Sequence, residues 1–220
     1  MNGRLWYVSY GSNLLRERFF SYLTGSDESS EFGAHPPAPS TALPAGEKWL
    51  WIDYPLYFAG VSRRWTGASA FVSTTADGAN RSVAHGYLLD GVQFAHLAAV
   101  ENVVASIDVG GTETLAIGQW SQLAVDREGE SFRGKYDALL RLPDIDGRPA
   151  FTLTSSIARE PGEPSSRYLS TIRRGLLSAP EDLEVDAYLQ AAIERSAEIT
   201  SARRDSSSTA ARCSPTTEKQ

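Results

Sequence analysis

The spacing of hydrophobic and polar residues changes along the chain, and each change predicts a different element. Residues 5–9, LWYVS, form a short run of aromatic and β-favouring types, which predicts a strand. After a Gly-Ser-Asn turn, apolar residues recur at helical spacing over residues 15–23. Ser12 or Asn13 is suited to cap this helix, which we expect to begin near Asn13, and Gly25 is suited to end it. The chain therefore opens with a strand, a tight turn and a helix.

Later apolar runs predict a mixture of strands and helices. The runs with strand character lie at residues 56–61, 68–74, 85–89, 136–142 and 150–155. A second helix begins after Asp90, where Asp90 and Gln93 can form a capping box. Two further helical patterns cover residues 165–177 and 181–199. These elements predict a mixed α+β fold with a sheet of antiparallel or mixed strands.

Two segments break these patterns. Residues 25–47 are rich in Ser, Gly, Pro and Ala, and their prolines exclude a helix or a central strand. This predicts a long loop, which is either a plain connection or a lid over a site. Beyond about residue 201 the chain is polar and nearly free of large apolar residues, which predicts disorder. We therefore expect one domain over residues 1–198 and a disordered polar tail over residues 199–220.

Composition and charge narrow the class of protein. Hydrophobic residues make up 41% and charged residues 22% of the 220-residue chain, as in ordinary globular proteins. A formal net charge of −6, with basic residues clustered only in pairs, argues against a nucleic-acid partner. The N-terminus lacks a secretory signal pattern, and no apolar run approaches the roughly 20 residues that span a bilayer. The single cysteine, Cys213, excludes an intrachain disulfide, so we expect a cytoplasmic protein without a membrane partner.

The turn at Gly11, Ser12 and Asn13 is the first candidate for chemistry. A helix that starts here leaves backbone N–H groups without intrahelical acceptors, and these donors suit an anion or a carbonyl oxygen. Gly11 permits close approach to the backbone, and the Ser12 and Asn13 side chains add polar contacts. The alternative is an ordinary capped helix start that binds no ligand. Both interpretations fit the local sequence.

Glu101 is the second candidate. It shares one helical face with Phe94, Leu97 and Ala98, which should be buried. Desolvation on this stripe would raise the pKa of Glu101 and suit the carboxylate to accept a proton near neutral pH. The alternative is a structural carboxylate at the end of the helix, bonded to backbone N–H groups or to an arginine.

Other common signatures of catalysis are missing from the sequence. The three histidines, His35, His85 and His96, are too scattered to predict a metal site. The chain contains no G-x-S-x-G elbow, no Walker phosphate loop and no G-x-G-x-x-G motif. Three common enzyme classes therefore lack sequence support.

Three motifs, in order along the chain, resemble the gamma-glutamylcyclotransferase superfamily. The run YVSYGSNLL at residues 7–15 resembles the family's Y-G-S-N-L loop, which follows the first strand. WTGASA at residues 65–70 is similar to its W-x-G-G-x-A segment, and PSSRYLSTIRRG at residues 164–175 is similar to its late P-S-x-x-Y-x-x-x-I-x-x-G helix start. The resemblance covers about residues 4–195.

The resemblance implies a fold, a reaction and a set of residues. The implied fold has a barrel-like sheet with flanking helices. In the implied reaction, which uses no cofactor, the α-amine of a small gamma-glutamyl substrate attacks its own γ-carbonyl and releases 5-oxoproline and an amine or amino acid. Glu101 matches the glutamate that acts as general base and then general acid. The residues implied to bind the substrate are Tyr10, Gly11, Ser12, Asn13, Leu14 and Tyr168.

Two other functions stay open. Better-known family members carry an acidic pair in L-D-x-x-E-G, whereas this chain reads AAVENV around Glu101, which fits a non-catalytic binding or regulatory module. An amidohydrolase or amide transferase, in which water or another amine attacks the acyl group, is the third option. Tyr168 is either a pocket residue or an ordinary residue of an amphipathic helix that also contains Ile172. The leaving group and the oligomeric state are left open.

Overall fold

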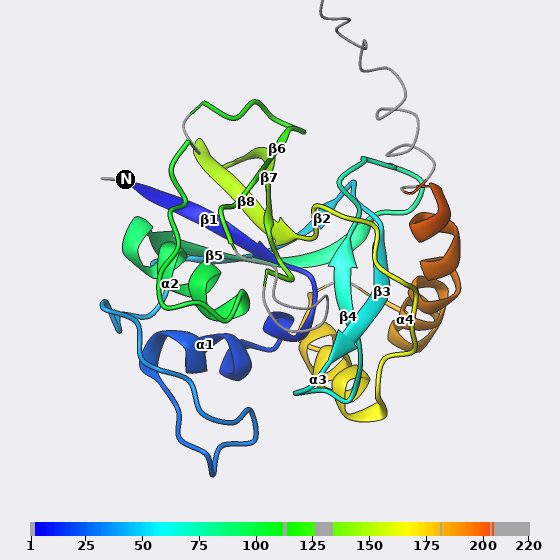
Figure 1. Ribbon diagram of the computed structural model, residues 1–220, viewed down its shortest axis with the longest axis horizontal. Helices are drawn as coiled ribbons and strands as arrows, with labels where there is room; N and C mark the ends of the chain where they lie inside the picture. The colour runs from blue at the N-terminus through cyan, green and yellow to red at the C-terminus, as the bar shows by residue number, and fades with distance from the viewer. Residues whose placement is uncertain (1–2, 112–113, 126–133, 181, 203, 205–220) are drawn as a thin grey trace, which may run out of the picture.

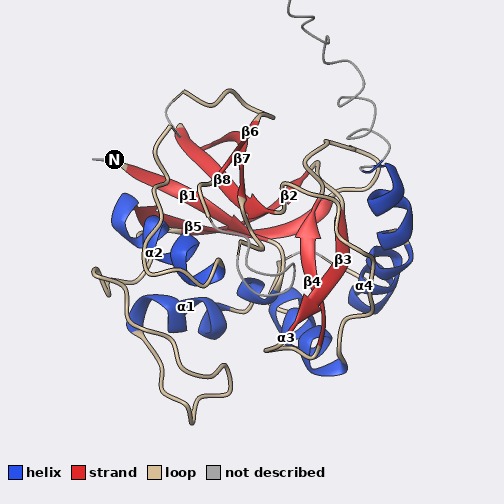
Figure 2. Cartoon of the chain, viewed as in Figure 1, coloured by secondary structure: helices blue, strands red, loops and turns tan. Residues whose placement is uncertain are grey.

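The strands of the computed structural model lie in two sheets (Figures 1 and 2). The structure describes residues 3–111, 114–125, 134–180, 182–202 and 204. The strands are β1 (Arg4–Ser9), β2 (Glu47–Ile52), β3 (Leu56–Ser62), β4 (Gly67–Val72), β5 (Ser82–Asp90), β6 (Trp120–Gln122), β7 (Ala138–Ile145) and β8 (Arg148–Thr154). Six of them form one sheet in the order β2-β5-β1-β8-β7-β6, and β3 pairs with β4 separately. Because β1 is antiparallel to β5 and parallel to β8, the large sheet is mixed.

The architecture confirms the predicted mixed α+β class. The six strands predicted from apolar runs correspond to β1, β3, β4, β5, β7 and β8. Two strands were not predicted: β2, which follows the Pro-rich segment and buries fully only its last residue, and β6, which has three residues. The hydrogen-bonded order of the described strands is open, whereas the resemblance implies a barrel-like sheet.

Four α-helices and a short 3₁₀ helix flank the sheets in the described part of the chain. They are η1 (Ser12–Leu14), α1 (Arg16–Thr24), α2 (Gly91–Glu101), α3 (Ser166–Leu176) and α4 (Val185–Glu194). The predicted capping box of Asp90 and Gln93 is present at the start of α2. Gly25 ends α1 with a positive φ of 79°, as predicted.

The predicted start of the first helix near Asn13 is wrong. Leu14 and Leu15 donate their backbone N–H groups to the carbonyls of Gly11 and Ser12, three residues back, so the chain first winds as a 3₁₀ turn. The α-helix begins at Arg16, and neither Ser12 nor Asn13 caps it, because the N-cap is Leu15 without a side-chain hydrogen bond. The side chain of Asn13 is thereby left for other contacts.

The C-terminal end is helical for longer than α4 alone. Residues 196–202 are again helical, and Thr200 is buried with 1% of its surface exposed. The predicted disordered tail thus overlaps helical residues at 199–202, and its residues 205–220 lie outside the described residues. The division into one domain and a tail stays a prediction.

The two faces of the large sheet pack against different layers. Side chains alternate along β1, so Leu5 and Tyr7 pack with residues of α1 and α2, whereas Trp6 and Val8 pack with residues of β3, β4, α3 and α4. Figure 1 shows α1 and α2 together on one side and α3 and α4 beside the β3–β4 hairpin. The end of β1, where the 3₁₀ turn follows, lies where both layers meet.

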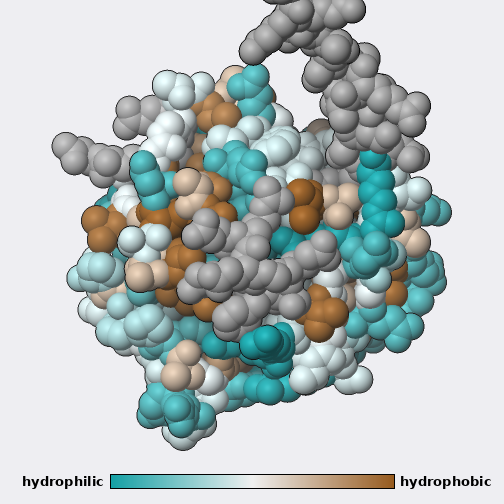
Figure 3. Space-filling model, viewed as in Figure 1, coloured by the Kyte–Doolittle hydropathy of each residue, from teal (hydrophilic) through white to brown (hydrophobic). Residues whose placement is uncertain are grey.

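The surface and the helix lengths add two observations. On the face seen in Figure 3, hydrophobic residues lie in separate groups among hydrophilic ones, as is normal for a protein surface. Within the described ranges, every helix is too short or too polar to cross a membrane.

Candidate active site

The turn after β1 presents unpaired backbone donors. Among the described residues, no acceptor takes the backbone N–H groups of Gly11, Ser12 or Asn13, because the 3₁₀ bonds start only at Leu14. These three groups follow one another at the end of the strand, so they can converge on one oxygen atom or one carboxylate. The predicted free donors are therefore present, although a 3₁₀ turn leaves them free rather than the start of an α-helix, and their binding of an anion or a carbonyl oxygen stays a prediction.

Asn13 connects this turn to Glu101, 88 positions further along the chain. Its Nδ2 donates to Glu101 Oε1 at 2.9 Å and to the Tyr7 hydroxyl at 3.3 Å. Asn13 is 4% exposed, and its Oδ1 is buried without a hydrogen-bond partner among the described residues. The structure thus brings together the two candidates that the sequence singled out separately, and leaves a polar atom unsatisfied beside them.

Glu101 is the last residue of α2. Phe94, Leu97 and Ala98 of the same helical face are fully buried, as predicted, whereas Glu101 is partly exposed. A helix end at this position places the carboxylate at the rim of the buried stripe, where it reaches both the turn and open space. Asn102, the C-cap, holds this end through hydrogen bonds from its side chain to the carbonyls of Ala98 and Tyr136.

The turn and Glu101 open on a cavity of about 320 Å³. Of the residues predicted to bind a substrate, five line it: Tyr10, Gly11, Ser12, Asn13 and Tyr168. Leu14 does not line it, because its side chain is 1% exposed in the core. Leu14 instead contributes its carbonyl to a network behind the turn. Whether the five lining residues contact a substrate stays a prediction.

Tyr168 is both a residue of an amphipathic helix and a cavity residue, the two positions that the sequence left open. It lies on the buried face of α3 together with Ile172, and it also lines the cavity. Its hydroxyl accepts a hydrogen bond from the Ala70 backbone N–H at 3.2 Å. Burial raises the pKa of Tyr168 to about 12, so the phenol is neutral at physiological pH.

The cavity also contains cationic residues that were not predicted from the sequence. Arg18, Arg63, Arg64 and Lys135 line it, and Glu101 is the sole acidic side chain among its described lining residues. Arg18 occurs within a helical pattern and Arg63 and Arg64 within a hairpin, where arginine is usually a solvated surface residue. Only tertiary packing brings these residues to one cavity.

Lys135 is buried in this cavity, next to β4. Its Nζ donates to Ser69 Oγ at 2.8 Å. Burial lowers the pKa of Lys135 to about 8, although the negative charge of Glu101 acts in the opposite direction. Lys135 is therefore a cation near neutral pH that loses its charge in mildly alkaline solution.

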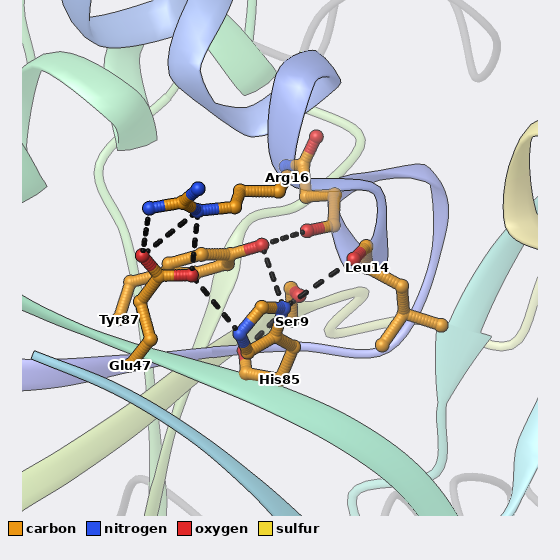
Figure 4. A network of polar contacts seen from close by, with 7 residues as sticks. Ser9, Leu14, Arg16, Glu47, His85 and Tyr87 are labelled. Carbon is orange, nitrogen blue, oxygen red and sulfur yellow. Dashed lines mark hydrogen bonds and ion pairs between the residues drawn. The ribbon is translucent and has the colours of Figure 1, made fainter. Parts of the chain in front are cut away.

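A second network holds the 3₁₀ turn from behind (Figure 4). The Tyr87 hydroxyl donates to the Asn13 carbonyl at 2.8 Å and lies 2.9 Å from His85 Nδ1. His85 Nδ1 is also 3.3 Å from the Leu14 carbonyl, and His85 Nε2 is 3.4 Å from Glu47 Oε2. These contacts hold the carbonyls of Asn13 and Leu14, which belong to the two peptide groups directly after the free amides.

The described residues contain no group of three or more histidine, cysteine, aspartate or glutamate side chains that could hold a metal ion. The described residues that line the cavity contribute backbone amides, one carboxylate, hydroxyls, the imidazole of His35 and cationic side chains.

Two solved structures align with most of the chain. An uncharacterized protein from Homo sapiens shares 18% identity over 86% of this chain and 88% of its own length, with a TM-score of 0.50. A structure named gamma-glutamyl cyclotransferase shares 14% identity over 85% of both chains, with a TM-score of 0.48. No family model matches the chain, and no curated protein matches its sequence. The human protein shares the fold of this chain.

Proposed function

We propose that this chain is a cofactor-free cyclotransferase that converts a small gamma-glutamyl compound into 5-oxoproline and a free amine. One observation carries the proposal: three free backbone N–H groups at residues 11–13 and the carboxylate of Glu101 open on the same cavity, joined by the bond from Asn13 to Glu101. A site that cyclises a glutamyl group needs donors to hold an acyl oxygen and a base to accept a proton from the amine.

The reaction needs two proton transfers at one carboxylate. The substrate α-ammonium group gives a proton to Glu101, and the neutral amine attacks the γ-carbonyl carbon. Glu101 then returns its proton to the nitrogen of the leaving amine, and the bond between that nitrogen and the γ-carbon of the tetrahedral intermediate breaks. The ring nitrogen loses its second proton to the released amine, so the products are 5-oxoproline and the amine in its ammonium form, and the Glu101 carboxylate is regenerated.

The turn contributes orientation and charge stabilisation. Free N–H groups at Gly11, Ser12 and Asn13 can hold the glutamyl group and donate to the oxyanion that develops on the γ-carbonyl oxygen. The network behind the turn keeps these donors in place, so little reorganisation is needed during the reaction. The unsatisfied Oδ1 of Asn13 is suited to accept a hydrogen bond from the substrate ammonium group.

A product-resolved assay tests this proposal. Purified full-length protein is incubated with a panel of gamma-glutamyl amines and gamma-glutamyl amino acids, and products are separated by mass spectrometry. We expect 5-oxoproline and the free amine in equal amounts. Free glutamate in place of 5-oxoproline would instead identify an amidohydrolase. Ligand binding without any product would identify a non-catalytic module.

A further inference from the structure

Hydrogen bonds tie Lys135 to the end of the helix that carries Glu101. The Asn102 side chain accepts from the Tyr136 backbone N–H at 2.9 Å and donates to the Tyr136 carbonyl at 3.0 Å. The Asn102 carbonyl accepts from the Gly134 N–H at 3.4 Å. Because Lys135 lies between these bonded residues and Glu101 directly precedes Asn102, the backbones of the lysine and the glutamate are held next to each other.

The ammonium group of Lys135 lies in the cavity wall with spare hydrogen-bonding capacity. Lys135 is 9% exposed and lines the cavity together with Glu101 and Ser69. An ammonium carries three N–H donors, and among the described residues only Ser69 Oγ accepts from it. Glu101 faces the lysine across the cavity, but within the described part of the chain no carboxylate forms an ion pair with Lys135. The cation can therefore still interact with a negative charge on a bound molecule.

The neighbours of Lys135 determine its charge. Burial lowers its pKa to about 8, the negative charge of Glu101 opposes this shift, and the positive charge of Arg159 adds to it. Arg159 lies behind the lysine, with its Nη2 donating to the Lys135 carbonyl at 3.4 Å. The Tyr136 ring lies 5.7 Å from Nζ, and burial raises the pKa of its hydroxyl well above the usual value, so it stays neutral. At neutral pH, Lys135 is thus a cation in a poorly solvated wall.

The guanidiniums of Arg18 and Arg64 have other partners. Arg18 donates to the Tyr22 hydroxyl and to His35, and Arg64 donates to His35 and to the Phe32 carbonyl. These bonds connect the arginines to α1 and to the Pro-rich loop. Lys135 differs from them because residues 134–136 are bonded to the end of α2.

We propose that the Lys135 ammonium group stabilises the oxyanion that forms on the γ-carbonyl oxygen of the substrate. This inference rests on the proposed function. Both nitrogens that exchange protons with Glu101 are bonded to the γ-carbon of the tetrahedral intermediate, and so is the oxygen that becomes negative. A cation held beside Glu101 is therefore held beside this oxygen, which the free amides of residues 11–13 approach from the turn.

The role of Lys135 is electrostatic and involves no proton transfer. The oxygen gains its negative charge when the amine attacks the γ-carbon, and loses it when the bond to the leaving nitrogen breaks. A fixed cation in a poorly solvated wall stabilises this charge without having to reorient, and the lysine keeps its proton throughout. Because the charge is absent from the bound substrate, the effect should appear in kcat rather than in KM.

The test measures kcat and KM for 5-oxoproline release from gamma-glutamyl-alanine between about pH 6 and about pH 10. Full-length wild type is compared with Lys135→Met, which has no charge, and with Lys135→Arg, which stays charged over this whole range. Lys48→Met is the matched control, because Lys48 is exposed and lies outside the lining of this cavity. Near-UV circular dichroism at each pH verifies that every variant is folded.

At pH 7, Lys135→Met should lower kcat about 100-fold with little change in KM, as the loss of one oxyanion donor does. Wild-type kcat should fall as the pH rises through about 8, where the ammonium loses its proton. Lys135→Met should lack this fall, whereas Lys135→Arg should stay within about tenfold of wild type at pH 7 and keep its rate at higher pH. Ionisation of the substrate amine is common to all variants, so their comparison isolates Lys135. Lys48→Met should match wild type.

Three results would overturn the inference. A normal kcat with a raised KM in Lys135→Met would show that the lysine binds a carboxylate of the substrate instead. An alkaline fall that persists in Lys135→Met would belong to another group. Equal losses in Lys135→Met and Lys135→Arg would show that the charge is not required. Failure of the proposed function looks different: wild-type protein releases no 5-oxoproline at any pH, and this inference then falls with it.

Discussion

Two cavities of about 320 Å³ meet at the 3₁₀ turn, and they differ in how well their polar groups are paired. In the cavity behind the turn, Glu47 is paired with Arg16 at 2.9 Å and faces His85, and Lys48 is paired with Asp146 at 2.7 Å. In the candidate active site, by contrast, the backbone amides at residues 11–13 have no acceptor within the described part of the chain.

The comparison indicates which of the two cavities is better suited to bind a ligand. Both contain a glutamate and a histidine, so residue types alone do not separate them. Paired groups have already satisfied their hydrogen-bonding capacity within the protein and gain little from a ligand. Groups that folding leaves unpaired gain most when a ligand arrives, which favours the cavity that contains Glu101.

The largest effect should come from replacing the glutamate of the candidate active site with glutamine. Glu101→Gln keeps an oxygen that can accept from Asn13 but removes the base, so kcat should fall by about 100- to 10,000-fold. Steady-state release of 5-oxoproline measures it. Glu47→Gln, in the paired cavity, is the control and should retain most of the activity. Comparable losses in both variants would remove the distinction between the cavities.

Substitution at Gly175 should damage the support of both cavities. A Cβ at this position of α3 would lie 2.6 Å from the Leu15 nitrogen and 2.7 Å from the Leu14 carbonyl carbon. Gly175→Ala should therefore push α3 away from the turn and lower the free energy of unfolding by about 1 to 3 kcal/mol. Urea denaturation measures the change. At Gly78, where a Cβ meets nothing within 4 Å, the same substitution should cost much less.

The buried Lys135 should make the free energy of unfolding depend on pH. Its pKa is about 8 in the folded protein and about 10.4 in an unfolded chain, so between these values the unfolded state binds more protons. The free energy of unfolding of wild type should consequently rise from pH 8 to pH 10 relative to Lys135→Met, on the order of 2 kcal/mol. Denaturation at several pH values tests this. If the free energy of unfolding changes with pH in parallel for wild type and variant, burial does not lower the pKa of Lys135.

Tyr87→Phe should produce the smallest effect, because it removes one hydrogen bond from the paired network. Loss of the donor to the Asn13 carbonyl should lower stability by about 1 kcal/mol and raise KM more than it lowers kcat. Kinetics and urea denaturation of the same preparation measure both quantities. An unchanged KM would mean that the network does not position the turn.

Much of this molecule is readable from local sequence patterns. Alternating apolar runs located most strands, and the Asp90 capping box and the Gly25 stop follow from chemistry within a few residues. The start of the first helix was misplaced because the choice between a 3₁₀ turn and an α-helix depends on what holds the turn from outside. Tyr87 and His85, more than seventy positions away, supply that support.

The site was readable only in part, for the same reason. Glu101 and the Gly-Ser-Asn turn stand out locally, one by helical spacing and the other by turn chemistry. No local signal in the sequence marks the other basic residues of the cavity, Arg18, His35, Arg64 and Lys135. They come together only because α1, the Pro-rich loop, the β3–β4 hairpin and the segment before β7 pack around the same cavity. The burial of Arg18, His35 and Lys135, which marks them in the structure, cannot be inferred from spacing.

The most direct test of the central claim follows the oxygen atoms of the reaction. A single turnover of a gamma-glutamyl amino acid is run in water enriched in ¹⁸O, and the products are analysed by mass spectrometry. If the α-amine is the nucleophile, the product is 5-oxoproline without ¹⁸O, and Glu101→Gln abolishes its formation. Glutamate that carries one ¹⁸O in its γ-carboxylate would show that water attacks, and would contradict cyclisation by this cavity.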